Sequence, residues 1–266
     1  MDHKQIEAVA RKIFKANVER QQFRPLRGHD DPGSLEHAYD IQDALYRIMT
    51  AETDNGPVAG HKIANTSPAI QKLTGVDQPL YGSIFANTVH HSPYVADHAD
   101  FMRLGVEFEI ALQISKDVQM SAAPYDSKSI SAFVKAAMPA FELIEDRCAD
   151  YSDLDAKSIL TDRCWCGGVV LGTPVENWQM IDLGNLNGTV TWNDELLDSG
   201  NTGNALGSPL NGLAWIANHL AGRGGRLLAG EIVMTGSALK TRFPNAGDCC
   251  TYEVAQLGKV SLCTSE

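Results

Sequence analysis

The stretch Val106-Glu107-Phe108-Glu109-Ile110-Ala111-Leu112-Gln113-Ile114 places an apolar residue at every second position. Successive side chains of a strand point to opposite faces, so the apolar residues share one face while Glu107 and Glu109 project side by side from the other. Two carboxylates this close repel each other unless water or a cation separates them, and their oxygens suit a hard divalent ion. The stretch therefore predicts a strand with candidate metal ligands, the alternative being a half-exposed strand with a polar face.

A second acidic stretch, Pro139-Ala140-Phe141-Glu142-Leu143-Ile144-Glu145-Asp146-Arg147, also reads as a strand. Glu142 lies among apolar residues there, and glutamate is rarely buried unless it is paired or coordinates a metal. Glu142 is therefore a third candidate ligand. An ion pair with Arg147 or with a nearby lysine is the alternative.

Hydrophobic periodicity divides the rest of the chain into a helical beginning and a β-rich remainder. Apolar residues recur at helical spacing over 6–18 and 35–49, and further helical segments are expected around 127–138 and 208–221. Ser208 and Pro209 provide an N-cap and a first helical residue for the last of these. We expect a helical N-terminal segment, 1–56, packed on a mainly β, mixed-sheet catalytic domain, 57–266. Strands of this domain are expected around 168–172, 188–192, 231–235, 250–254 and 259–263.

The composition excludes several classes of protein. With 44% hydrophobic and 21% charged residues, the 266-residue chain can bury a core and is not disordered throughout. Its 22 basic and 33 acidic residues give a net charge of −11, which argues against nucleic-acid or anionic-membrane partners.

The cysteines and the N-terminus suggest a cytoplasmic protein. Six cysteines are too few for a disulfide scaffold and do not form the paired motifs of a zinc site, so reduced thiols are expected. The first residues are polar and amphipathic, and no stretch approaches the roughly 18 apolar residues of a membrane span. Neither secretion nor a membrane span is expected.

Seven short motifs together carry a resemblance. In chain order they are GHKIANTS (60–67), GVDQPLYG (75–82), the Glu107-x-Glu109 strand, 139–147, ALGSPLN (205–211), AWIAN (214–218) and AGEIVMTG (229–236). The chain resembles the 2-keto-4-pentenoate hydratase and 4-oxalocrotonate decarboxylase family of the fumarylacetoacetate hydrolase superfamily over about residues 38–263.

This resemblance implies an α+β fold of the fumarylacetoacetase C-terminal-like type and a Mg²⁺ or Mn²⁺ ion held by Glu107, Glu109 and Glu142. In such enzymes the metal chelates the carboxylate and 2-oxo oxygens of a short keto acid. Lys62, in the G-x-K motif, would bind substrate charge or shuttle a proton with a lowered pKa. The family also tends to form homo-oligomers.

Five further residues are candidates for substrate binding: Gln78, Tyr81, Asp162, Arg163 and Ser237. Gln78 and Tyr81 lie in a segment that approaches the pocket in the family, and Ser237 follows a predicted strand near the expected substrate carboxylate. Asp162 matches the family, whereas Arg163 and Trp165 bring charge and bulk to a segment that normally carries small residues. That change suggests an altered substrate with an extra anionic or aromatic group.

The expected reaction is hydration of 2-hydroxypenta-2,4-dienoate. The family's hydratases usually carry Asp where this chain has Leu80, and its decarboxylases tend to have an apolar residue there, so decarboxylation of 4-oxalocrotonate is the alternative. Further alternatives are C–C hydrolysis of an acylpyruvate and a non-catalytic role as a complex partner. The expected ligand is a small 2-oxo acid.

Overall fold

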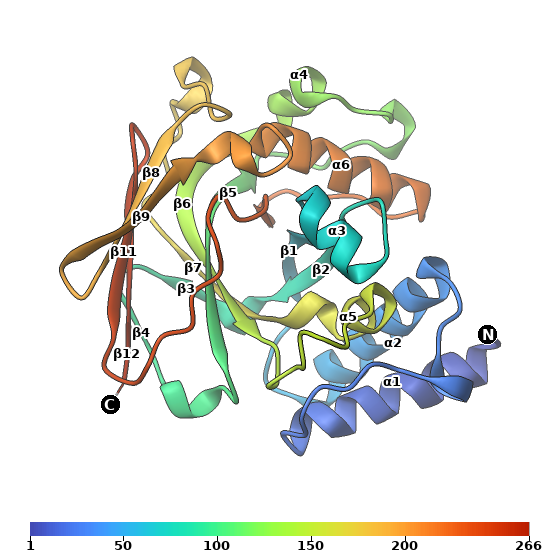
Figure 1. Ribbon diagram of the computed structural model, residues 1–266. Coiled ribbons are helices and arrows are strands. Elements are labelled where there is room, and N and C mark those ends of the chain that lie inside the picture. Colours follow the sequence, from blue (N-terminus) through green and yellow to red (C-terminus); the bar gives the residue numbers. More distant parts are fainter. Residues whose placement is uncertain (266) are drawn as a thin grey trace.

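One β-sheet lies in the middle of the protein and a second, smaller sheet lies along one side, in a computed structural model that describes residues 1–265 (Figure 1). The helices are α1 (His3–Val18), α2 (Leu35–Glu52), α3 (Pro68–Thr74), α4 (Ser127–Ile130), α5 (Ala156–Thr161) and α6 (Pro209–Gly222). The strands are β1 (Val58–Ala64), β2 (Leu80–Phe85), β3 (Val89–His91), β4 (Tyr94–Ala96), β5 (Leu104–Ile114), β6 (Val134–Glu145), β7 (Cys166–Leu171), β8 (Asn187–Trp192), β9 (Glu195–Asn201), β10 (Ile232–Met234), β11 (Cys249–Val254) and β12 (Gly258–Thr264).

Both sheets are mixed. The larger has the strand order β2-β1-β10-β5-β6-β7-β3, and the smaller has the order β4-β12-β11-β8-β9. The pairs β1–β10, β3–β7 and β4–β12 are parallel, while the remaining pairs are antiparallel. The long strands β5 and β6 pair along almost their whole length and lie in the interior of the larger sheet. Side chains on these two strands are therefore held by neighbours on both sides.

The predicted alternation of the 106–114 stretch is confirmed. Its apolar residues are all buried, and Phe108 packs edge-on against Phe141 of β6 and Tyr252 of β11, with ring centroids 5.7 Å apart in both cases. This face of the larger sheet thus joins the core that it shares with the smaller sheet. Glu107 and Glu109 project from the opposite face.

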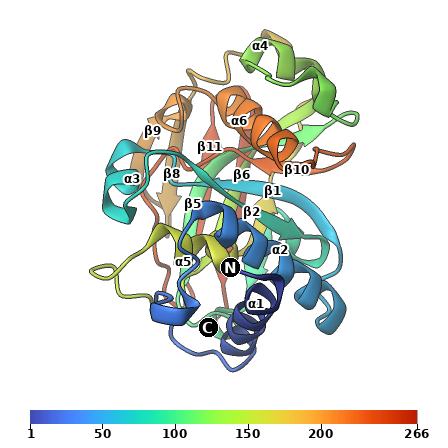
Figure 2. The same ribbon diagram turned by 90° about the vertical axis from the view of Figure 1, so that its right-hand side faces the viewer.

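The N-terminal helices pack against the side of the larger sheet. The side chains of Asp2 and Ser34 cap α1 and α2, and Val9, Ile13, Ile41 and Leu45 form a separate apolar cluster with Phe85 of β2. Figure 2 shows both helices in front of the sheet and α6 above them. Within residues 1–265, no helix is both long and apolar enough to cross a bilayer.

The expected helix at 127–138 is largely wrong. Only α4 and one 3₁₀ turn, Ser131–Phe133, are helical, and β6 begins at Val134. Pairing with β5 determines the structure of the second half of this segment, and such non-local pairing overrides local helical spacing. The helix expected at 208–221 is confirmed as α6, with Ser208 as its N-cap and Pro209 as its first residue.

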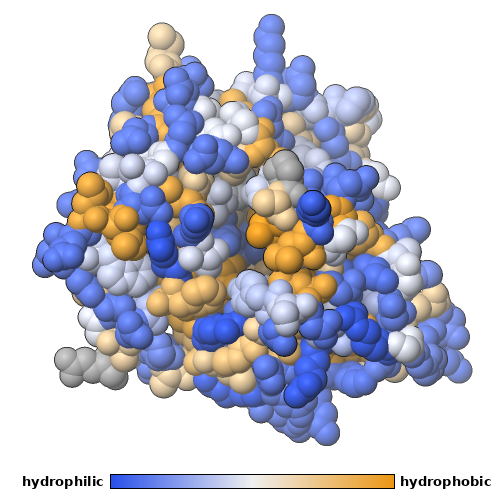
Figure 3. All heavy atoms as spheres, in the orientation of Figure 1, coloured by the Kyte–Doolittle hydropathy of each residue, from blue (hydrophilic) through white to orange (hydrophobic). Residues whose placement is uncertain are grey.

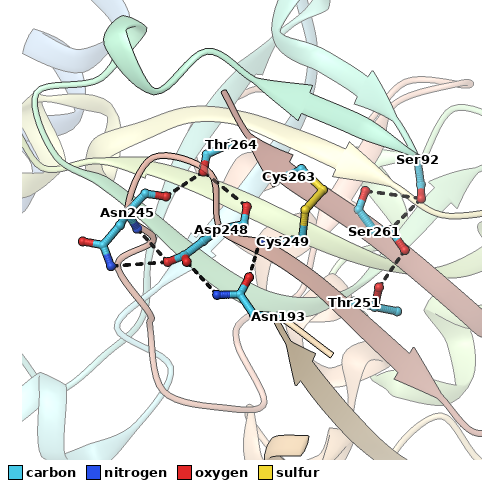
Figure 4. The surroundings of a disulfide bond; sticks show 9 residues. All are labelled: Ser92, Asn193, Asn245, Asp248, Cys249, Thr251, Ser261, Cys263 and Thr264. Atoms are coloured by element: carbon cyan, nitrogen blue, oxygen red, sulfur yellow. Dashed lines mark hydrogen bonds between the residues drawn. A yellow bond between two sulfur atoms is a disulfide. The ribbon is translucent and has the colours of Figure 1, made fainter. Parts of the chain in front are cut away.

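The expectation of reduced thiols is wrong for two of the six cysteines. Cys249 and Cys263 form a disulfide between β11 and β12 (Figure 4). They are directly opposite each other in the antiparallel ladder, with Cα atoms 4.0 Å apart, a contact that depends on strand register and not on sequence spacing. The thiols therefore no longer argue for a reducing compartment. Cys148, Cys164, Cys166 and Cys250 are free.

Candidate metal centre

Three carboxylates converge on one face of the larger sheet. Glu107 on β5 is directly opposite Glu142 on β6, and Glu109 lies two residues further along β5 on the same face. Their carboxylate oxygens include one from each residue that all lie within 4.8 Å of one another. Glu109 and Glu142 are completely buried. The prediction that Glu107 and Glu109 share a face is thus confirmed.

The surroundings of the carboxylates leave room for a cation to bind. Glu109 accepts a hydrogen bond from the backbone N–H of Gly236 (2.7 Å) at Oε2, but its Oε1 has no hydrogen-bond partner among the described residues. Glu107 accepts a hydrogen bond from the Thr241 hydroxyl (2.6 Å). A buried carboxylate oxygen without a partner is costly, and several such oxygens around one point are the donor set that Mg²⁺ and Mn²⁺ prefer. The residues present therefore fit a hard divalent ion.

The hydrogen bond to Glu109 depends on a glycine. Gly236 has φ +100°, in the region that favours glycine, and a Cβ atom there would lie 2.5 Å from Cγ2 of Thr66. Any side chain at position 236 would therefore move the backbone N–H that holds Glu109.

Lys62 lies beside this cluster. It is on β1, is 2% exposed, and its Nζ is 2.9 Å from Oε1 of Glu142. Burial alone would lower the pKa of Lys62, but the negative charges of Glu142 and Glu107 outweigh it and raise the pKa above its usual value. The expected lowering of the Lys62 pKa is therefore wrong for the protein without a cation, because lysine and carboxylates are buried together.

Burial has the opposite consequence for the carboxylates. It raises the pKa of Glu142 and of Glu109 above the usual range, and repulsion between the neighbouring carboxylates raises both further. Gly236 and Lys62 only partly offset these effects. The metal-free cluster therefore retains a proton at a pH where exposed glutamates are ionised.

This proton predicts how Mn²⁺ binding depends on pH. A metal must displace the proton, so we expect Mn²⁺ affinity to fall by up to about tenfold per pH unit between about pH 8 and pH 6. Because the folded-state pKa values are raised, the metal-free protein loses stability as pH rises through them. Added Mn²⁺ should therefore raise the melting temperature most at the alkaline end. Calorimetric titrations and thermal melts in the same buffers test this, and a pH-independent Mn²⁺ affinity would contradict it.

The cluster opens onto a cavity of about 730 Å³. Figure 3 shows the molecule hollowed near its centre, with hydrophobic surface on both sides of the hollow. Lys62 and Glu107 line the cavity together with residues of α3, of the segment before α5, and of the loop after β10. Such a volume is typical of small-molecule sites.

Of the five predicted substrate-binding residues, the structure brings only Ser237 to the cavity. Its hydroxyl donates to the carbonyl of Leu239 (2.9 Å) and accepts from the N–H of Phe108 (3.0 Å), so it holds the loop after β10 against β5. Gln78 is exposed outside the cavity. Tyr81 is buried and does not line the cavity, and its ring stacks on Tyr39 with centroids 4.8 Å apart.

Asp162 and Arg163 point away from the cavity. The Asp162 carboxylate pairs with Arg147 and accepts a hydrogen bond from Asn17 (2.9 Å). The Arg163 guanidinium donates to the carbonyl of Cys166 (2.8 Å). Leu80 is also completely buried and does not line the cavity. The charge that Arg163 seemed to bring to the pocket is thus absent from it, whereas Trp165 does line the cavity.

Sequence reasoning missed Thr241, Tyr151 and the apolar residues of α3 that line the cavity, Ile70 and Leu73. For α3 a signal exists, since Ser67-Pro68 resembles a helix start and Gly75 a helix end. Thr241 lies in a loop and carries no such signal.

A variant of Thr241 tests whether the hydrogen bond to Glu107 contributes to metal affinity. Thr241→Val removes the hydrogen bond to Glu107 but no ligand, so we expect Mn²⁺ affinity to fall about 10- to 100-fold. Calorimetric titration measures the effect. Thr251→Val, on β11 and outside the cavity, is the matched control and should leave the affinity unchanged. Equal affinities in the two variants would show that Thr241 does not orient Glu107.

Known proteins resemble this chain in sequence and in fold. The 2-keto-4-pentenoate hydratase of Paraburkholderia phymatum is 31% identical over 265 residues, covering 100% of this chain and 99% of that protein. The protein of the same name from Burkholderia vietnamiensis is 31% identical and covers 89% of this chain and 88% of its own length. The solved 4-oxalocrotonate decarboxylase of Pseudomonas putida G7, complexed with magnesium and adipate, has a TM-score of 0.90, 25% identity, and coverage of 99% of this chain and 98% of its own.

These similarities confirm the predicted fold. The family model described as fumarylacetoacetate (FAA) hydrolase C-terminal matches residues 72–263, well over half of the chain and both of the strands that carry the carboxylates. The chain therefore belongs to the fumarylacetoacetate hydrolase C-terminal family.

Proposed function

We propose that this protein is a Mg²⁺- or Mn²⁺-dependent lyase that hydrates 2-hydroxypenta-2,4-dienoate. The observation that carries the proposal is the convergence of Glu107, Glu109 and Glu142 beside buried Lys62 at a cavity of small-molecule size. The two relatives named 2-keto-4-pentenoate hydratase support the choice of reaction.

When bound, the metal would supply Lewis-acid chemistry that stabilises negative charge on the oxygens of a 2-oxo acid. The chain's own residues prepare the site for it. Gly236 and Thr241 fix the orientations of Glu109 and Glu107 by hydrogen bonds, so the ligands need little reorganisation. Lys62 holds a proton at Nζ inside the cavity, where it can bind the anionic substrate and exchange a proton with it.

Decarboxylation of 4-oxalocrotonate is the second candidate. The structural similarity to the 4-oxalocrotonate decarboxylase favours it, as does the apolar residue at position 80. In that reaction the 2-oxo group would accept the electron pair left by the departing CO₂. An acylpyruvate hydrolase would instead need a histidine–glutamate pair to activate water, and no histidine is among the described residues that line the cavity.

One assay separates these reactions. The purified protein with Mg²⁺ is given 2-hydroxypenta-2,4-dienoate and 4-oxalocrotonate separately, and ultraviolet absorbance and CO₂ release are followed. Loss of the dienoate absorbance without CO₂ supports hydration, and CO₂ release from 4-oxalocrotonate supports decarboxylation. Turnover of neither compound would contradict the proposal.

We also infer that the protein is a homo-oligomer, because the resemblance to the family implies assembly. Size-exclusion chromatography with light-scattering detection measures the mass of the protein in solution. A monomer at micromolar concentration would contradict the inference.

A further inference from the structure

One side of the cavity is built from apolar side chains. Helix α3, the end of β6, the segment around α5 and the residues before β7 contribute Ile70, Leu73, Ile144, Leu154, Ile159 and Trp165. Ile70 and Leu73 are 43% and 53% exposed although they border the cavity. Two large aliphatic side chains left open to solvent at a cavity indicate that an apolar group can be buried against them.

A strained segment forms part of this wall. Arg163, Cys164 and Trp165 are three consecutive non-glycine residues with left-handed backbone angles, φ 58°, 49° and 60°. Such a conformation costs free energy at each residue and persists only where the surrounding structure fixes it. Gly82 helps to fix it, because a Cβ atom at that position would lie 2.4 Å from the carbonyl oxygen of Arg163.

The strained segment decides which side chain reaches the cavity. It turns the guanidinium of Arg163 toward the carbonyl of Cys166 and places the indole of Trp165 at the cavity wall. The ring of Phe23 packs edge-on against Trp165 from behind, with centroids 5.0 Å apart. The segment thus replaces a possible positive charge with an aromatic surface.

Among the described residues, the elements that contribute these apolar side chains contribute no cation to the cavity lining. The lysines that line the cavity are Lys62, beside Glu142, and Lys240, in the loop after β10. The Tyr151 hydroxyl is already used, since it donates to Asp146 (3.1 Å). Within residues 1–265 the indole N–H of Trp165 has no hydrogen-bond partner, but this group is neutral. A carboxylate placed against this side would be removed from water without a counter-ion, which is unfavourable.

We propose that the site prefers relatives of 2-hydroxypenta-2,4-dienoate that carry an uncharged, apolar substituent, alkyl or aryl, at the end distant from the acid group, and that Ile70, Leu73 and Trp165 bind that substituent. The inference rests on the proposed function, because it places the 2-oxo acid group at the carboxylate cluster. The cavity of about 730 Å³ has room for such a group beside a short acid.

Unreactive 2-oxo acids test the proposal without turnover. The Mn²⁺-loaded protein is titrated in a calorimeter with pyruvate, 2-oxobutanoate, 2-oxopentanoate and 2-oxohexanoate, and with 2-oxoadipate as the length-matched acid with a charged end. We expect affinity to rise about three- to fourfold per added methylene and 2-oxoadipate to bind more weakly than 2-oxohexanoate.

A variant on the exposed face of α3 avoids a folding defect. Leu73→Asn, which adds no charge beside the anionic ligand, should reduce the gain per methylene to less than about twofold. Leu196→Asn, on β9 and 73% exposed without lining the cavity, is the matched control and should show the same gain in affinity per methylene as the wild type.

The outcomes separate the two proposals. Affinity that does not change with chain length, or tighter binding of 2-oxoadipate than of 2-oxohexanoate, would overturn the apolar subsite alone. If 2-oxoadipate binds more tightly than 2-oxohexanoate and Lys240→Gln removes this difference, Lys240 would be the residue that binds the distal carboxylate. Failure of pyruvate and all longer acids to bind the Mn²⁺-loaded protein would overturn the proposed function, and the subsite with it.

Discussion

Glu142→Gln is expected to abolish tight Mn²⁺ binding and to destabilise the metal-free protein by about 3–5 kcal/mol. The variant loses one of three carboxylate ligands, and it also leaves the Lys62 ammonium buried without the carboxylate that lies 2.9 Å from it. An unpaired buried charge costs far more than a pair is worth. Calorimetric titration with Mn²⁺ and urea unfolding of the metal-free protein measure the two effects.

A double variant distinguishes lost pairing from general damage. Glu142→Gln combined with Lys62→Met removes both charges, so it should recover most of the stability but none of the Mn²⁺ affinity. Glu253→Gln, an exposed position on β11, is the matched control and should change neither quantity. Unchanged Mn²⁺ affinity in Glu107→Gln, Glu109→Gln and Glu142→Gln alike would show that the carboxylate cluster is structural.

Lys62→Met alone should lower kcat by about 10²- to 10⁴-fold, the usual contribution of a positioned proton donor or acceptor. Its Mn²⁺ affinity should be kept or improved, because a positive charge beside the ligands has been removed. Activity on the dienoate and calorimetric titration on the same sample give both numbers.

A lysine with a purely structural role would not give a large fall in kcat together with an unchanged or improved Mn²⁺ affinity. Lys128→Met, at an exposed position of α4, is the matched control and should retain full activity. A kcat within a fewfold of wild type in Lys62→Met would exclude a catalytic role for this lysine.

The carboxylate cluster could be predicted from sequence because its signals are local. Alternation along 106–114 places Glu107 and Glu109 on one face, and a glutamate among apolar residues marks Glu142. That Glu142 faces Glu107 depends on the pairing of β5 with β6. This register is a long-range property, and only the resemblance to a known family anticipated its result.

The orientation of the segment after α5 could not be predicted. Arg163 and Trp165 are neighbours of a family-matching Asp162, which suggested that all three approach the pocket. Three consecutive left-handed residues decide otherwise, and their backbone angles depend on the close approach of Gly82, a tertiary contact. The pairing of Cys249 with Cys263 escaped prediction for a similar reason, since it follows from the register of β11 and β12.

The opposition of Glu107 and Glu142 across two neighbouring strands also has a consequence for biosynthesis. Like charges directly opposite each other disfavour strand pairing, so β5 and β6 must associate against a repulsion until β1 brings Lys62 alongside. A cation captured early by the nascent hairpin would relieve the same repulsion. The manganese or magnesium supply of the producing cell is therefore expected to influence how much of the newly made chain reaches the native state.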